Sequence, residues 1–251
     1  MQNKQSVTIL GDGGWGTTLS ILLSKKGYDI CLWGAFGDYV KSLKEKRENV
    51  RFLKGIKIPS KIFITSDIKQ AWKFSQTAIL AIPSEYLRSV LNKIKEYDND
   101  EKIFLSATKG IENKTLMRMS EVIFDELGKV NLAVLSGPNI SQEIAHGMPA
   151  VSVVASQDSK IAGYFQNLLM SDKFRVYTNV DVIGVELGGS LKNIIALACG
   201  ISDGLGFGSN AKAALLTRCL VEISRLGVAL GAKRETFFGV SGLGDLVTTC
   251  F

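Results

Sequence analysis

The sequence predicts an α/β protein in which a doubly wound, mostly parallel sheet is followed by an all-helical domain. Short apolar runs alternate with amphipathic helical patterns over residues 1–181, which is typical of parallel sheets wrapped by helices. A glycine-rich turn joins the first apolar run to the first helical pattern, and strand patterns stop at residue 182. We therefore expect a sheet domain over residues 1–181 and a helical domain over residues 182–251.

The first strand and helix enclose a phosphate-binding turn. An apolar strand pattern covers residues 7–10, and Gly11, Gly13 and Gly16 then complete G-x-G-x-x-G. The glycines permit a tight turn, close approach of the backbone to a pyrophosphate, and close packing of helix on strand. The N-terminus of the following helix adds free N–H groups for the phosphates. With a second strand over 29–33, the turn predicts a Rossmann-type dinucleotide site; the alternative is a purely structural turn.

The remaining elements follow from the same alternation. Further strands are expected over residues 62–65, 78–83, 102–108, 132–136, 151–155 and 175–178. Helices are expected over 85–95, 115–127 and 159–169, and longer ones over 185–201 and 210–230. Ligands bind beyond the carboxyl ends of the strands in such sheets, so the turn segments that follow three strands become candidate site segments: 83–84, 108–110 and 136–139.

Composition narrows the class of protein. With 46% hydrophobic residues in 251, the chain can bury a substantial core. Neither a secretory segment nor an apolar run of about 18 residues is evident, so we expect a soluble cytoplasmic protein without membrane insertion. The net charge of +6 equals the excess of basic residues between positions 41 and 61. That segment lacks interleaved aromatic residues, which indicates a solvated face or attraction of an anionic ligand and not nucleic-acid binding.

The four cysteines are widely spaced, so we expect reduced thiols and no metal site. The single histidine, His146, lies beside a glycine and near a proline, as an ordinary loop residue would. A loop position of this kind argues against a catalytic role for His146.

The candidate chemistry centres on Lys192. On the helix expected over 185–201, Lys192 shares a face with small and apolar residues, so its ammonium either reaches solvent at the edge of that face or exchanges a proton inside the site. Lys109, at the end of a strand, could bind an anion there or be an ordinary surface lysine. Asp245 and Thr249 are four residues apart and would share a helical face, although Asp245 alone would more often be a helix N-terminal residue.

These motifs together resemble the NAD(P)-dependent sn-glycerol-3-phosphate dehydrogenases of the bacterial type. The resemblance covers the whole chain in family order, through residues 11–17, 81–84, 108–110, 136–138, 185–193, 210–214 and 242–250. It implies reversible hydride transfer between NAD(P)H and dihydroxyacetone phosphate, giving sn-glycerol 3-phosphate for phospholipid synthesis. The expected cofactor is NADP or NAD, with NADPH slightly favoured, and the expected partners are a small phosphorylated triose and, in a homodimer, a second copy.

The resemblance also implies roles for individual residues. Lys192 would donate and accept the proton, with Lys109, Asp245 and Thr249 beside it as further catalytic residues. The cofactor contacts it implies are Gly11, Gly13, Gly14, Trp15, Gly16, Pro83, Lys109 and Ser141. The substrate contacts it implies are Lys109, Gly137, Asn139, Lys192, Asn193 and Asp245.

The chain departs from the family pattern in three places. Family members continue after Phe251 with an arginine and asparagine pair that binds phosphate and cofactor, so we expect a helical domain that is incomplete at its C-terminus. Gly34, Ala35 and Phe36 follow the second strand, where a carboxylate for the ribose or an arginine for a 2′-phosphate is usual. Asn139 replaces a small hydroxyl residue. Two alternative functions therefore stay open: a catalytically impaired nucleotide-binding remnant, and a related two-domain hydroxy-acid dehydrogenase.

Overall fold

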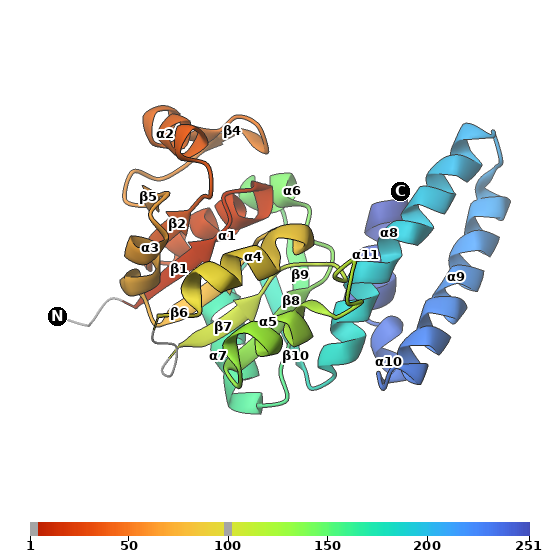
Figure 1. Ribbon diagram of the computed structural model, residues 1–251. Coiled ribbons are helices and arrows are strands. Elements are labelled where there is room, and N and C mark those ends of the chain that lie inside the picture. Colours follow the sequence, from red (N-terminus) through yellow and green to blue (C-terminus); the bar gives the residue numbers. More distant parts are fainter. Residues whose placement is uncertain (1–4, 98–101) are drawn as a thin grey trace.

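The computed structural model describes residues 5–97 and 102–251, and its centre is an eight-stranded sheet (Figure 1). The strand order is β10-β9-β8-β7-β6-β1-β2-β5. All neighbouring strands are parallel except β8 and β9, which are antiparallel. This arrangement confirms the expected mostly parallel sheet. The strands are β1 (Ser6–Leu10), β2 (Asp29–Trp33), β5 (Phe63–Thr65), β6 (Thr77–Leu80), β7 (Ile103–Ser106), β8 (Asn131–Ser136), β9 (Ala150–Ala155) and β10 (Phe174–Asn179).

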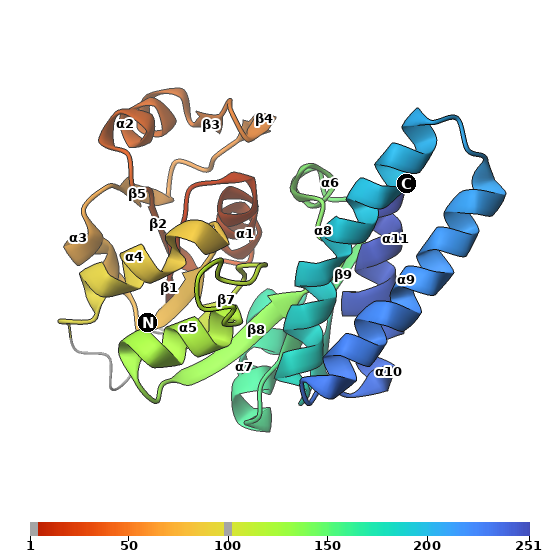
Figure 2. The same cartoon turned by 45° about the vertical axis from the view of Figure 1, so that its right-hand side comes forward.

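Helices cover both faces of this sheet because its central strands bury side chains on both sides. Successive residues of a strand point to opposite faces: Ile9 and Leu105 belong to one hydrophobic cluster, while their neighbours Leu10 and Phe104 belong to the other. Figures 1 and 2 show α1 and α7 on one face and α3, α4 and α5 on the other. The helices of this part are α1 (Gly14–Lys25), α2 (Gly37–Lys46), α3 (Ile68–Phe74), α4 (Ser84–Ile94), α5 (Met119–Leu127), α6 (Ser141–Ala145) and α7 (Ser159–Leu169).

Residues 182–251 form helices without strands, as Figure 2 shows. The long helices α8 and α9 run side by side, and α11 packs against α8. A third cluster of buried apolar residues, including Leu191, Ile195 and Phe237, joins these helices. The elements are α8 (Val182–Gly204), α9 (Ser209–Ala229), α10 (Arg234–Phe237), the π-helical turn η1 (Val240–Gly244) and α11 (Asp245–Cys250).

One helix has the length and composition of a membrane span. Within residues 5–97 and 102–251, a single helix, α8, is long and apolar enough to cross a membrane, with 56% of its most apolar window buried. Glu186 on this helix accepts hydrogen bonds from Arg118 and from Ser120. Because α8 packs against β8 and Glu186 binds the start of α5, α8 is a core helix of the fold.

Two further details differ from the predicted elements. The helix expected from residue 115 begins at Met119, because residues 111 and 118 form an isolated bridge that keeps the intervening segment in a turn. A short antiparallel hairpin, β3 (Glu48–Asn49) and β4 (Leu53–Lys57), follows α2. Its strands are short and charged, so they carry no apolar alternation that would predict them.

Candidate active site

The glycine-rich turn connects β1 to α1, and its geometry explains Gly11 and Gly16. Gly11 has φ of +120°, and a Cβ there would lie 2.2 Å from the Ala81 carbonyl oxygen. A Cβ on Gly16 would lie 1.9 Å from the Gly11 carbonyl oxygen. By contrast, no atom of the described chain lies within 4 Å of a Cβ placed on Gly13. The turn is therefore closed against strand β6 at Gly11 and open at Gly13, where backbone N–H groups can meet a phosphate.

The hairpin β3–β4 packs over this turn through Asn49, which sequence reasoning missed. The Asn49 side chain is fully buried, and its Nδ2 donates to the Asp12 carbonyl oxygen at 2.9 Å and to Thr17 Oγ1 at 2.7 Å. A lone asparagine in a charged segment gives no sequence signal for such a contact. The turn is thus held from both sides, by β6 and by the hairpin, in a form that fits a dinucleotide.

The lysines expected to carry chemistry meet at one buried carboxylate. Asp245 is 1% exposed, and its Oδ2 accepts from Lys109 Nζ at 2.6 Å while its Oδ1 accepts from Lys192 Nζ. Lys192 Nζ also donates to Thr249 Oγ1 at 2.7 Å, and Lys109 Nζ donates to the Gly137 carbonyl oxygen at 2.8 Å. We call Lys109, Lys192, Asp245 and Thr249 the lysine cluster.

The charges of the lysine cluster do not cancel, because two ammonium groups share one carboxylate. Burial lowers the pKa of Lys109; the Asp245 carboxylate opposes this shift and the Lys192 ammonium adds to it. The Lys109 side chain keeps 25% of its surface exposed. A cluster that is net positive and still reachable can attract an anion and can exchange a proton with it.

The lysine cluster depends on close packing of α8 against the end of β8 and against η1. A Cβ on Gly189 would lie 2.4 Å from Ser136 Oγ, and one on Gly188 would lie 2.7 Å from the Ser241 carbonyl oxygen. Ser190 Oγ accepts from the Gly110 backbone N–H at 3.0 Å. The glycine pair therefore brings Lys192, about one turn further along α8, next to Lys109 and to α11.

The other predicted residues occupy the same end of the sheet without joining the lysine cluster. Each lies in a turn or at a helix end that follows a strand, except Asn193, which is exposed beside Lys192 on α8. Asn139 Nδ2 donates to Ser152 Oγ at 2.6 Å. Trp15 packs against Phe174, and Gly14 begins α1. Pro83 is exposed at the start of α4, and the Ser141 carbonyl oxygen accepts a hydrogen bond from Thr18 Oγ1.

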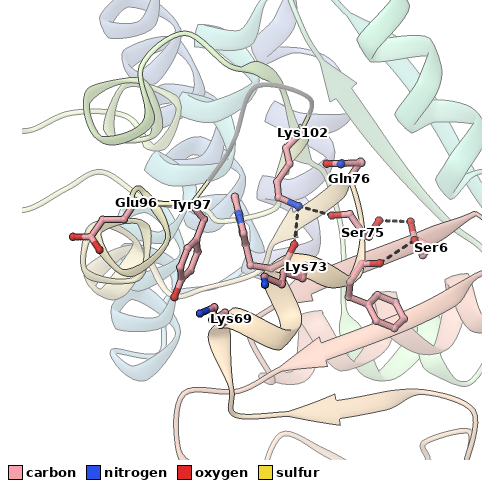
Figure 3. A pocket seen from close by; sticks show the side chains of 10 residues that line it. Ser6, Lys69, Lys73, Ser75, Gln76, Glu96, Tyr97 and Lys102 are labelled. Atoms are coloured by element: carbon pink, nitrogen blue, oxygen red, sulfur yellow. Dashed lines mark hydrogen bonds between the residues drawn. The ribbon is translucent and has the colours of Figure 1, made fainter.

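A separate cavity of about 790 Å³ lies at the opposite, amino-terminal end of the strands (Figure 3). Ser6, Gln76 and Lys102 line it and lie at or just before the starts of β1, β6 and β7. Lys102 Nζ donates to the carbonyl oxygens of Trp72 and Ser75, as Figure 3 shows. Its ammonium is thus engaged in holding α3 against the sheet, and the chemistry-bearing residues lie at the other end.

Comparison with known proteins agrees with this geometry. The family model described as NAD-dependent glycerol-3-phosphate dehydrogenase N-terminus matches residues 6–162, and the corresponding C-terminus model matches residues 181–251. The glycerol-3-phosphate dehydrogenase [NAD(P)+] of Clostridium acetobutylicum is 46% identical over 244 residues, which cover 97% of this chain and 74% of that protein. The enzyme of the same name from Syntrophomonas wolfei is 49% identical, with 97% and 72% covered.

Solved structures give the same result. The crystal structure of glycerol-3-phosphate dehydrogenase from Coxiella burnetii superposes with a TM-score of 0.95 at 39% identity, covering 99% of this chain and 76% of that one. The glycerol-3-phosphate dehydrogenase from Saccharomyces cerevisiae superposes with a TM-score of 0.86 at 29% identity, covering 99% and 78%. The likeness therefore extends over both the sheet and the helical part of the chain.

Proposed function

The chain belongs to the NAD-dependent glycerol-3-phosphate dehydrogenase family, and we propose on that premise that it interconverts dihydroxyacetone phosphate and sn-glycerol 3-phosphate with NAD(P)H. The observation that carries the proposal is the sharing of the Asp245 carboxylate by Lys109 and Lys192. A phosphorylated ketone needs a positive site for its phosphate and a proton donor for its carbonyl oxygen, and this arrangement supplies both.

The glycine-rich turn binds the cofactor, and the lysine cluster binds the substrate and transfers the proton. We assign the pyrophosphate of NAD(P)H to the backbone N–H groups at the start of α1, beside Gly13. When bound, the reduced nicotinamide supplies a hydride to the C2 carbon of the ketone. Trp15, Pro83 and Ser141 are proposed to contact the cofactor, because they line the same end of the sheet as the turn.

The lysine cluster transfers the proton of the substrate hydroxyl group and offsets the negative charge of the substrate phosphate. The Lys192 ammonium donates a proton to the carbonyl oxygen as that oxygen becomes an alkoxide, and in the reverse direction the neutral amine takes the proton back. The Asp245 carboxylate and Thr249 Oγ1 hold Lys192 Nζ in place. The Lys109 ammonium, 2.6 Å from Asp245 Oδ2, offsets the charge of the substrate phosphate, with Gly137, Asn139 and Asn193 completing the substrate site.

The proposal extends to the organisation of the chain. Residues 1–181 act as the dinucleotide-binding domain and residues 182–251 as the substrate domain. We propose that the enzyme works in the cytoplasm, supplies glycerol 3-phosphate for phospholipid synthesis, and associates as a homodimer. Exposed apolar side chains on α8, namely Ile194, Leu197 and Ile201, support an association surface on the helical part.

The experiment that tests this function replaces Lys192 with methionine, which keeps the aliphatic stem and removes the ammonium. We expect turnover of dihydroxyacetone phosphate to fall at least about 100-fold, because a positioned general acid is lost, while NADH binding measured by fluorescence stays unchanged. The matched control is Lys93→Met at an exposed position of α4, which should keep wild-type turnover. Normal turnover by the Lys192→Met enzyme would remove Lys192 from the mechanism.

A further inference from the structure

The carboxylate of Asp12 lies at the carboxyl end of β2, although its residue belongs to the glycine-rich turn after β1. A Cβ built on Gly34, the residue that follows β2, would lie 2.0 Å from Asp12 Oδ2 and 2.8 Å from Val40 Cγ2. Asp12 therefore fills the space that a side chain at position 34 would need. The Asp12 carboxylate can occupy this position only because Gly34 has no side chain.

The carboxyl end of β2 is the place where dinucleotide folds hold the adenosine ribose, by a carboxylate for the 2′-hydroxyl or by an arginine for a 2′-phosphate. Gly34, Ala35 and Phe36 offer neither group. Asp12 brings a carboxylate to the same place from the neighbouring strand. We propose that Asp12 selects NAD(H) over NADP(H), by accepting a hydrogen bond from the ribose 2′-hydroxyl and by repelling a 2′-phosphate.

The Asp12 carboxylate is short of partners, which fits a group that completes its bonds with a ligand. Its Oδ2 is buried and has no hydrogen-bond partner in the described part of the chain, while the residue as a whole is only partly buried. Burial raises the pKa of the Asp12 carboxyl, against a hydrogen bond from its own backbone. A buried acceptor without a donor is costly, and the partly exposed side of the residue is where a ribose hydroxyl would reach the carboxylate.

The basic segment over residues 41–61, which would favour NADP if it folded toward the adenosine end, is partly engaged elsewhere. Arg47 Nη1 donates to the Ile62 carbonyl oxygen at 2.9 Å, Lys57 Nζ pairs with Glu48 at 3.1 Å, and Lys61 Nζ donates to the Ser24 carbonyl oxygen. Arg51 lies over the Phe52 ring, 5.0 Å from its centroid. Arg51 would have the opposite effect to Asp12, because its guanidinium could bind the 2′-phosphate of NADPH that the Asp12 carboxylate would repel.

The inference rests on the proposed function only in assuming a nicotinamide dinucleotide site, so its test uses binding without substrate. Fluorescence titrations with NADH and NADPH give two dissociation constants for the wild-type chain and for Asp12→Asn. We expect the wild type to bind NADH more tightly, and Asp12→Asn to lower the NADH-to-NADPH preference by about 10-fold or more, since a charged hydrogen bond and a charge repulsion are both lost.

Matched variants show whether Asp12, Asp38 or Arg51 sets the preference between NADH and NADPH. Asp38→Asn removes an exposed carboxylate in the first turn of α2 and should leave the preference unchanged. Arg51→Ala should also keep the wild-type preference for NADH. Wild-type chain titrated with 2′-deoxy-NADH should bind about 10-fold more weakly than with NADH, which needs no variant to fold. Tighter binding of NADPH by the wild type, or an unchanged ratio in Asp12→Asn, would overturn the inference. Selective NADH binding without turnover would instead count against the proposed function alone.

Discussion

Replacing Asp245 with asparagine tests the lysine cluster most severely, because one side chain there serves two ammonium groups. The asparagine keeps the shape of Asp245, but its carbonyl oxygen replaces only one of the two carboxylate oxygens that Lys109 and Lys192 contact separately. Its amide NH₂ then faces the other ammonium. Both lysine side chains are largely buried, with 25% and 11% of their surfaces exposed, so solvent cannot replace the lost carboxylate.

The expected loss of stability follows from that burial. Removing one partner of a buried ion pair typically costs about 3–5 kcal/mol, and we expect Asp245→Asn to fall near the lower end because Lys109 keeps some contact with water. Urea unfolding followed by circular dichroism measures the change. The control Asp203→Asn breaks the more exposed pair with Lys212 and should cost less than about 1 kcal/mol. Equal urea midpoints for wild type and Asp245→Asn would refute the shared-carboxylate interpretation.

The same variant has a defined pH dependence. Burial gives Lys109 a lower pKa in the folded chain than its ordinary 10.5, so the unfolded chain binds the proton more readily than the folded chain. Stability must therefore rise as the pH rises from the lowered pKa toward about 10.5. Asp245 opposes the shift, so its loss should extend the rise to lower pH. A stability of Asp245→Asn that falls over this pH range would contradict the sign of the argument.

Two further predictions concern the cofactor turn. Gly16→Ala places a Cβ against the Gly11 carbonyl oxygen and should lower the free energy of unfolding by about 1–3 kcal/mol, as thermal melting would show. Gly13→Ala lies at φ of −69° in open space and should change that free energy by less than about 0.5 kcal/mol. The Gly13→Ala chain should nevertheless bind NADH more weakly in a fluorescence titration. Asn49→Ala removes the hydrogen bonds that hold the β3–β4 hairpin over the turn, so trypsin should cleave at the exposed Arg51 and Lys54 faster than in the wild type.

The sequence predicts the lysine cluster well because each member lies in a local pattern. Lys192 shares a helical face with small residues, Lys109 ends a strand, and Asp245 and Thr249 are one helical turn apart. Parallel strands bring their carboxyl ends to one edge of a sheet, so residues that end strands are expected to meet there. The roles of the individual site residues remain proposals, which the variants above address.

Contacts between distant segments could not be predicted in this way. The placement of Asp12 beside Gly34 depends on the pairing of β1 with β2 and on the missing side chain at position 34. Asn49 reaches the turn from a hairpin whose short, charged strands have no apolar periodicity. The antiparallel pairing of β8 with β9 also leaves no mark on either strand, since both are apolar runs of equal length. Only the folded chain shows these neighbours.

We propose that the net positive lysine cluster selects a phosphorylated ketone at the nicotinamide site. The most direct test compares kcat/KM for NADH oxidation with dihydroxyacetone phosphate, with dihydroxyacetone, and with a 2-keto acid of three carbons. Because Lys109 and Lys192 share only one carboxylate, we expect dihydroxyacetone phosphate to exceed both other substrates by at least about 100-fold, the discrimination expected when a substrate lacks a charged partner. Equal rates with dihydroxyacetone, or a faster reaction with the keto acid, would contradict this account.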